Sequence, residues 1–216
     1  MKRDPRTVTK LVPVPSTNII PERDVDKSPI LECRHLGIDF GGLTAVEDFN
    51  MAIGRTEIAG LIGPNGAGKT TVFNLLTKVY QPTRGTILVD GHDTAGKSTI
   101  QVSHMGIART FQNIRLFKEL TVMDNVLIGL HHEMDYRLAG AILRLPSYWR
   151  GERIARERAM ELLGIFDMQD MADYKAGSLP YGAQRRLEIV RALATNPSLL
   201  LLDEPAAGMN PNETEE

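Results

Sequence analysis

This sequence of 216 residues lacks the features of a secreted or membrane-embedded protein. It has one cysteine, Cys33, so no internal disulfide framework can form, which suits a reducing compartment such as the cytoplasm. No stretch approaches the roughly 18 consecutive apolar residues that a membrane-spanning helix needs. The basic residues 1–10 are not followed by the apolar segment of a secretory signal.

The sequence also lacks an excess of charge of either sign. With 25 basic and 27 acidic residues, the formal net charge is −2, which gives no bulk electrostatic reason to bind nucleic acid or anionic lipid. Hydrophobic residues make up 42% and charged residues 24%, close to the average of globular chains, which excludes a disordered or fibrous body. The length predicts one domain, or one domain with a small insertion.

Proline sets the first 28 residues apart from the rest of the chain. Five of the twelve prolines lie within the first 29 residues. Because proline blocks helix interiors and central strands, we expect residues 1–28 to form an extended, flexible leader. The folded domain is predicted to span residues 29–216.

The first half of this domain shows strand patterns around one helical segment. An antiparallel pair is predicted for the first two strands, joined at Gly41-Gly42. Apolar residues at i, i+3, i+4 and i+7 predict an amphipathic helix over residues 72–79. The predicted strands of this half are residues 30–40, 46–53, 57–62 and 86–89.

The second half is predicted to be helical until near its end. Residues 121–176 contain helical patterns, with Ala155, Ala159, Leu162, Leu163 and Phe166 on one face, and no convincing strand. Residues 199–202 form a continuous apolar run, which is typical of a parallel strand covered on both faces. We therefore predict an α/β fold in which a helical insertion interrupts a sheet.

A glycine-rich motif follows the predicted strand at 57–62 and precedes the predicted helix. Residues 63–70, GPNGAGKT, match G-x-x-x-x-G-K-[ST], in which glycines let successive backbone N–H groups point at phosphate oxygens. Lys69 is predicted to bind the β- and γ-phosphates, and the Thr70 hydroxyl to ligate Mg²⁺. This context favours a nucleotide site over an incidental glycine-rich turn. The predicted nucleotide ligands are Gly63, Pro64, Asn65, Gly66, Ala67, Gly68, Lys69, Thr70 and Thr71.

Two carboxylates, Asp203 and Glu204, follow the apolar run at 199–202. Ligands of open α/β sheets bind at the carboxyl ends of the strands, so Asp203 is predicted to hold Mg²⁺ opposite Thr70. Glu204 is predicted to orient and partly deprotonate an attacking water molecule. Alone, such a pair could be a solvated strand end; together with the glycine-rich motif it indicates a catalytic site.

Three segments resemble parts of the ATPases of ABC transporters, and they follow one another along the chain at residues 108–117, 179–187 and 203–211. Residues 108–117, ARTFQNIRLF, resemble the Q-loop segment, and residues 203–211, DEPAAGMNP, resemble the Walker B end and the D-loop. Residues 179–187, LPYGAQRRL, resemble the signature motif, in the variant of branched-chain amino acid importers. The resemblance covers about residues 30–216. It implies a P-loop NTPase (RecA-like) core, a small antiparallel β lobe, and a helical signature subdomain at about 121–176.

The resemblance also implies roles for single residues. Phe40 would stack on adenine, and Gln112 would sense Mg²⁺ and the γ-phosphate and couple the site to a membrane subunit. Gly182 and its neighbours, including Gln184, would contact the γ-phosphate of ATP held by a second ATP-binding subunit. A helix predicted from Gln184 to Ala194 supports this role, because its dipole favours an anion near Gly182. From the residues alone, Phe40 could be an ordinary strand-end aromatic and Gln112 a surface amide.

The function implied is an ATP-hydrolysing subunit that powers an importer, most simply one for branched-chain amino acids. Its partners would be a second ATP-binding subunit, permease subunits at the cytoplasmic face of the plasma membrane and, indirectly, a substrate-binding protein, with no nucleic acid. The transported substrate itself is not encoded here. Alternatives are a soluble ABC ATPase, a small P-loop kinase, and a fragment that binds nucleotide without hydrolysing it.

The sequence departs from the family pattern at three places. Pro180 replaces the serine of the signature, and Ala183 its usual glutamine. No histidine follows His132, although the family carries a switch histidine after the D-loop. We therefore expect a truncated gene product or an incomplete sequence that lacks the last C-terminal elements.

Three further expectations concern residues without an assigned role. Arg185 and Arg186 are expected on a solvated helix face, with local ion pairs to Glu188. Cys33 is expected to be a small buried hydrophobe. His131, His132 and Glu133 are not expected to share a metal ion, because adjacent helical residues point in different directions.

Overall fold

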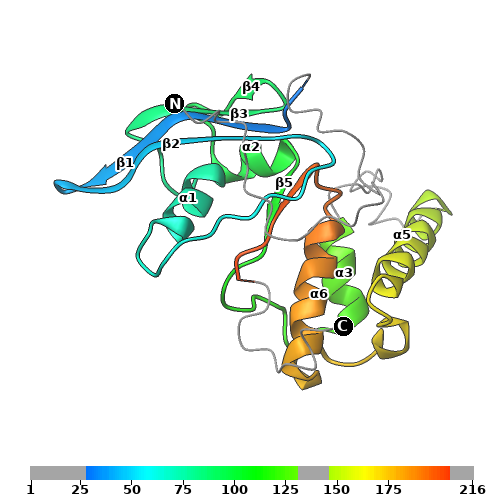
Figure 1. Cartoon of the computed structure of the whole chain (residues 1–216). Helices are drawn as coiled ribbons and strands as arrows, with labels where there is room; N and C mark the ends of the chain where they lie inside the picture. Colours follow the sequence, from blue (N-terminus) through cyan, green and yellow to red (C-terminus); the bar gives the residue numbers. More distant parts are fainter. Residues whose placement is uncertain (1–27, 131–145, 205–216) are drawn as a thin grey trace, which may run out of the picture. The chain divides into compact units, whose positions relative to one another are not determined.

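The computed structural model describes residues 28–130 and 146–204, which belong to two compact units (Figure 1). The boundary between the units falls between Ile107 and Ala108. The site residues predicted from the sequence are divided between them. Among the helices that the structure describes, none combines the length and the apolar character needed to cross a bilayer.

The first unit contains a four-stranded antiparallel sheet in the order β2-β1-β3-β4. The predicted pair at its start is confirmed, but β2 begins at Leu43, three residues earlier than expected. Phe40 pairs directly with Leu43 across the two-residue turn Gly41-Gly42, whose φ angles of 53° and 93° suit glycine. The strands are β1 (Leu31–Phe40), β2 (Leu43–Ile53), β3 (Arg84–Val89) and β4 (His92–Asp93).

Two helices complete the first unit, α1 (Lys69–Leu76) and α2 (Thr99–His104). The predicted apolar face of α1 is confirmed for Val72, Leu75 and Leu76, which are buried. The helix stops before Val79 because Lys78 adopts the left-handed region, with φ of 57°, and the side chain of Val79 is exposed.

The strand predicted at residues 57–62 does not form. The backbone there belongs to no strand that the structure describes, and the side chains of Ile58 and Ile62 are exposed. An apolar run becomes a strand only where its N–H and C=O groups pair with a neighbour, and no residue within 28–130 or 146–204 supplies a ladder to it. The prediction was wrong because periodicity carries no information about partners.

The second unit is mainly helical, with α3 (Val122–Leu130), α5 (Pro146–Gly164) and α6 (Tyr181–Leu193) packed on one another (Figure 1). Two 3₁₀ turns, η2 (Gln169–Met171) and η3 (Ala176–Ser178), connect α5 to α6. The predicted strand at 199–202 is observed as β6 (Leu199–Leu201), paired with β5 (Ile107–Arg109). The N–H of Thr110 donates to the carbonyl of Leu201 at 3.0 Å and extends this pairing.

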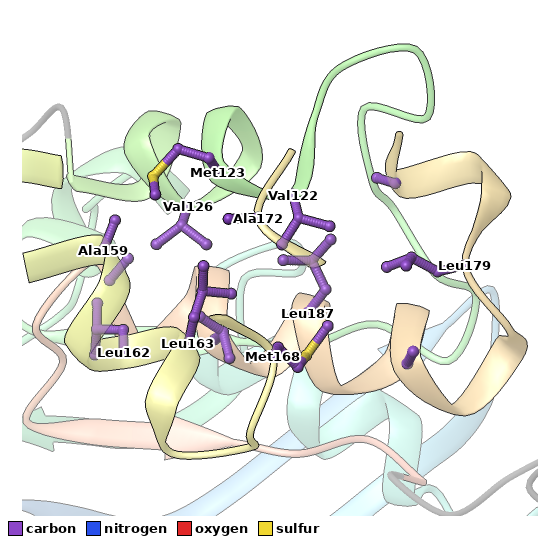
Figure 2. Packing of buried hydrophobic residues seen from close by; sticks show 14 of the residues in the cluster. Val122, Met123, Val126, Ala159, Leu162, Leu163, Met168, Ala172, Leu179 and Leu187 are labelled. Atoms are coloured by element: carbon purple, nitrogen blue, oxygen red, sulfur yellow. The ribbon is translucent and has the colours of Figure 1, made fainter. Parts of the chain in front are cut away.

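A single apolar cluster fills the space between the three helices of the second unit (Figure 2). Val126 of α3, Leu163 of α5 and Leu187 of α6 are completely buried in it. The face of α5 predicted from periodicity is confirmed, because Ala155, Ala159, Leu162 and Leu163 are all buried and Phe166 packs against the cluster. This core fixes α6 and therefore the segment that precedes it.

We predict that Leu163→Ala lowers the free energy of unfolding by about 2–5 kcal/mol, because it removes apolar contacts and leaves a cavity in the cluster. Ile154→Ala is the matched control, since Ile154 lies on the same helix with 55% of its surface exposed. Urea unfolding followed by circular dichroism measures both variants. Equal losses would contradict the assignment of Leu163 to the core.

Candidate functional site

The glycine-rich loop, residues 63–70, lies in the first unit and leads directly into α1. Gly66 and Gly68 both adopt φ of 82°, a conformation that L side chains rarely take. A Cβ on Gly68 would lie 2.7 Å from the carbonyl oxygen of Ala45 in β2, so a larger residue is excluded there by contact as well as by conformation. The loop is therefore a tight curl packed against the start of β2.

The loop and the first turn of α1 carry one ammonium group and several backbone N–H groups without a side-chain cap. The ammonium of Lys69 donates to the carbonyl oxygens of Gly63 at 2.6 Å and Pro64 at 2.9 Å. Gly68 is the N-cap of α1 and supplies no side-chain cap, so the first turn, Lys69, Thr70 and Thr71, presents its N–H groups without one. Pro64, Asn65, Gly66 and Ala67 are exposed beside them.

This donor set fits a polyphosphate. A helix N-terminus carries partial positive charge, and an ammonium on a flexible stem adds a full one. The hydroxyl of Thr70 is an oxygen ligand of the kind that Mg²⁺ prefers. The loop thus has the donors for a polyphosphate that its glycine-rich motif predicts.

Phe40 ends β1 with 42% of its surface exposed. Its ring packs edge-to-face against Tyr80, with ring centroids 5.2 Å apart and an interplanar angle of 74°. Sequence reasoning did not single out Tyr80, which lies forty residues further along the chain and belongs to no motif. Phe40 is therefore an exposed aromatic side chain held in place by a second one, and its stacking on adenine stays a prediction.

The acidic residues at the end of β6 lie in the second unit. Asp203 is buried, and Nη2 of Arg109 donates to its Oδ2 at 2.8 Å. Both side chains of this ion pair are at least 90% buried. Glu204 is exposed and adopts φ of 48°, which is uncommon outside glycine.

The structure brings Gln112 and Glu204 together. Nε2 of Gln112 donates to Oε2 of Glu204 at 3.2 Å, across 92 residues of sequence. An amide hydrogen-bonded to a carboxylate can set the direction in which the carboxylate oxygen points. The two residues for which the sequence suggests roles at the γ-phosphate are thus neighbours.

The expectation for Arg185 is wrong. Its side chain is 1% exposed and not solvated, although the expected ion pair with Glu188 forms, with Nη1 and Oε2 2.6 Å apart. The neighbouring Arg186 is half-buried. Helical spacing does not distinguish the two arginines, because burial of Arg185 depends on acceptors that come from distant segments.

The signature segment begins α6 earlier than predicted. The helix starts at Tyr181 with Pro180 as its N-cap, so Gly182 lies buried in the first turn. The side-chain amide of Gln184 donates to the carbonyl of Leu179 at 2.8 Å, which satisfies that carbonyl where the chain enters the helix. Gln184 thus has a structural contact in addition to the binding role predicted for it.

The predicted residues therefore form two groups. Phe40 and residues 63–71 belong to the first unit, whereas Gln112, Gly182, Gln184, Asp203 and Glu204 belong to the second. Outside these groups, Cys33 is buried as expected, and burial raises the pKa of its thiol to about 12. His131, His132 and Glu133 lie outside the described residues.

We predict that Arg109→Met lowers the free energy of unfolding by about 3–5 kcal/mol, because it leaves the buried carboxylate of Asp203 unpaired. The double variant Arg109→Met/Asp203→Asn should recover most of this loss, since no buried charge remains. Arg153→Met is the control, because Arg153 forms an exposed pair with Glu157 at 3.9 Å and should cost less than about 1 kcal/mol. Urea unfolding measures all three, and a double variant no more stable than Arg109→Met would refute the pairing argument.

Comparison with known proteins gives the same assignment as the motifs. A family model described as ABC transporter matches residues 46–207. The high-affinity branched-chain amino acid transport ATP-binding protein BraF of Pseudomonas aeruginosa is 46% identical over 188 residues, which are 87% of this chain and 74% of BraF. The protein of the same description from Escherichia coli, LivG, is 47% identical over the same shares.

Solved structures of ATP-binding cassettes are similar to this chain in fold. The ADP conformation of an ATP-binding cassette of an ABC transporter superposes with a TM-score of 0.72 at 30% identity, covering 87% of this chain and 73% of that one. A dimeric ATP-binding cassette in a post-hydrolysis state, bound to ADP and Pi, gives 0.69 at 25% identity, with shares of 86% and 78%. These similarities confirm the predicted α/β fold of a P-loop NTPase, and the chain belongs to the ABC transporter family.

Proposed function

We propose that this chain binds Mg²⁺ and ATP and hydrolyses the ATP to energise an importer of branched-chain amino acids. The observation that carries the proposal is the hydrogen bond between Gln112 and Glu204, in a chain whose glycine-rich loop has the donors for a polyphosphate. The choice of substrate rests on relatives described as branched-chain amino acid transport ATP-binding proteins.

The first unit binds the nucleotide. N–H groups of the loop and of the first turn of α1 donate to phosphate oxygens, and Lys69 leaves its two carbonyl partners to bind the β- and γ-phosphates. Phe40 offers its exposed ring to the adenine. Each of these contacts serves binding and orientation, so their loss should affect affinity first.

The second unit activates water. Glu204 accepts a proton from the attacking water as it aligns that water, and the amide of Gln112 keeps the carboxylate oriented. Bound Mg²⁺ would neutralise phosphate charge, with the hydroxyl of Thr70 and the carboxylate of Asp203 as its ligands from this chain. Arg109 fixes the carboxylate of Asp203 through one oxygen, Oδ2.

A second ATP-binding subunit and permease subunits complete the proposed transporter. Gly182 lies in the first turn of α6, whose N-terminal end favours an anion, and this suits contact with ATP held by the second subunit. The dimeric ATP-binding cassette to which the chain is similar supports such a pairing. The chain then works as a peripheral subunit at the cytoplasmic face of the membrane.

Lys69→Ala should weaken ATP binding by about 10²–10⁴-fold, because two charge-assisted contacts to phosphate are lost at about 1.5–3 kcal/mol each. Titration with a fluorescent ATP analogue measures the affinity. Lys97→Ala, at a half-buried lysine of the same unit, is the control and should bind as the wild type does. Unchanged affinity in Lys69→Ala would remove the loop from the nucleotide site.

Glu204→Gln should keep ATP binding and reduce hydrolysis by about 10²–10⁴-fold, because the amide retains the acceptor for Gln112 but cannot take a proton. The measurements are ATPase rate and leucine uptake by the transporter assembled with its permease subunits. Glu119→Gln, at an exposed residue of the same unit, is the control.

The two measurements separate the parts of the proposal. Wild-type turnover in Glu204→Gln would assign the base elsewhere. If a different class of solute stimulated ATP hydrolysis and leucine were not taken up, the proposed ATPase activity would stand. The proposed transported substrate would then be wrong.

A further inference from the structure

We propose that the buried pair Arg185–Glu188 positions Gln112 and Glu204, by holding the backbone at both residues in place relative to helix α6. The proposal rests on the proposed ATP hydrolysis and adds residues to its machinery that touch neither nucleotide nor water. The contacts that carry the proposal lie within the second unit.

Arg185 connects α6 to two segments that are distant from it in sequence. Nη1 donates to Oε2 of Glu188 at 2.6 Å and to the carbonyl of Phe111 at 2.5 Å. Nη2 donates to the carbonyls of Asp203 at 2.7 Å and Glu204 at 3.1 Å. One planar guanidinium therefore fixes the backbone at the residue before Gln112 and at Glu204 itself.

Glu188 fixes the other side of the same segment. Its Oε1 accepts from the N–H of Phe111 at 3.5 Å and from the N–H of Arg115 at 3.3 Å. Phe111 and Arg115 flank Gln112, Asn113 and Ile114, so the ion pair holds both ends of a three-residue loop. The reach of the Gln112 amide to Glu204 depends on this backbone.

Stability alone does not account for a charged pair at this place. Arg185 and Glu188 are 1% and 2% exposed, and burying two charges carries a desolvation cost that a pair of apolar residues of similar volume would not carry. The ion pair instead orients the backbone of the neighbouring segments, because it forms hydrogen bonds with five of their backbone groups. The hydrogen bond between Gln112 and Glu204 is exposed and too weak to impose that geometry by itself.

The pair also connects the signature segment at the start of α6 with the segments that carry Gln112 and Glu204. Gly182 precedes Arg185 by three residues on α6, which is about one helical turn. A shift of the first turn of α6 would therefore reach the backbone of Glu204 through the side chain of Arg185. Contact of Gly182 with the second subunit's nucleotide would thus act on the alignment of the general base.

The decisive variants are Arg185→Met and the double variant Arg185→Met/Glu188→Met. The single variant leaves Glu188 buried and unpaired and should lower the thermal midpoint, whereas the double variant removes both charges and should recover it. Arg158→Met/Glu161→Met is the matched control, because Arg158 and Glu161 form a pair with the same i,i+3 spacing whose side chains are 55% and 65% exposed. Glu188→Gln keeps the volume and tests the site if the larger changes prevent folding.

The readouts are the ATPase rate of the assembled transporter, the affinity for a fluorescent ATP analogue, and hydrogen exchange of the amides of Phe111 and Arg115. We expect kcat to fall about 10²-fold in the double variant in spite of its recovered midpoint, because small displacements of catalytic groups carry losses of that size. We expect about a tenfold loss in Glu188→Gln, where one oxygen replaces two. Affinity should change less than twofold, and the two amides should exchange faster.

A double variant with the wild-type midpoint and wild-type kcat would overturn the proposal, as would unchanged exchange of the two amides. Loss of turnover that merely follows loss of stability across all variants would overturn it too. If the wild type does not hydrolyse ATP, the proposed function fails, and exchange of Phe111 and Arg115 in the double variant against the exposed-pair control still decides whether the pair holds the loop.

Discussion

The position of the chain after β6 depends on two buried ion pairs, Arg109–Asp203 and Arg185–Glu188. The side chains of Arg109 and Arg185 are both buried, and both bind the residues that follow β6. Arg109 binds the carboxylate of Asp203, and Arg185 binds the carbonyls of Asp203 and Glu204. Buried charges are tolerated only when each one is paired. A substitution that removes one charge therefore leaves its partner buried and unpaired, which lowers the stability of the fold. This requirement fixes where the chain turns after β6 and hence where Glu204 lies, in spite of its exposed side chain.

The sequence predicted the features that depend on local chemistry. The turn at Gly41-Gly42 and the curl at Gly66 and Gly68 need positive φ, and glycine makes that need visible in the sequence. The buried face of α5 was predicted because a helix of 3.6 residues per turn repeats its apolar positions at regular intervals. The resemblance gave Gln112 a role at Mg²⁺ and the γ-phosphate, but no spacing predicted its hydrogen bond to Glu204, since 92 residues separate the two.

The features that were missed depend on distant partners. Residues 57–62 have the composition of a strand, but a strand also needs a neighbour, and composition does not say whether there is one. Arg185 was placed on a solvated face because arginine is rarely fully buried. The pair with Glu188 on the same helix was expected, but the burial of Arg185 also depends on backbone acceptors outside α6, the carbonyls of Phe111, Asp203 and Glu204, which helical spacing cannot reveal. Tyr80 was overlooked for the same reason, since its role exists only against Phe40.

The departures at Pro180 and Ala183 have a physical resolution in the structure. Serine is a preferred N-cap because its hydroxyl accepts from the first turn of a helix, and proline lacks that group. Pro180 nevertheless serves as the N-cap of α6, its φ of −54° is one that proline favours, and its carbonyl accepts from the N–H of Gln184 at 2.9 Å. The side chain of Gln184 binds the carbonyl of Leu179, so the entry to the helix remains satisfied by hydrogen bonds without the serine. These hydrogen bonds and the burial of the first turn of α6 determine the backbone conformation around Gly182. An anion bound there would be contacted by backbone N–H groups, which neither substitution removes.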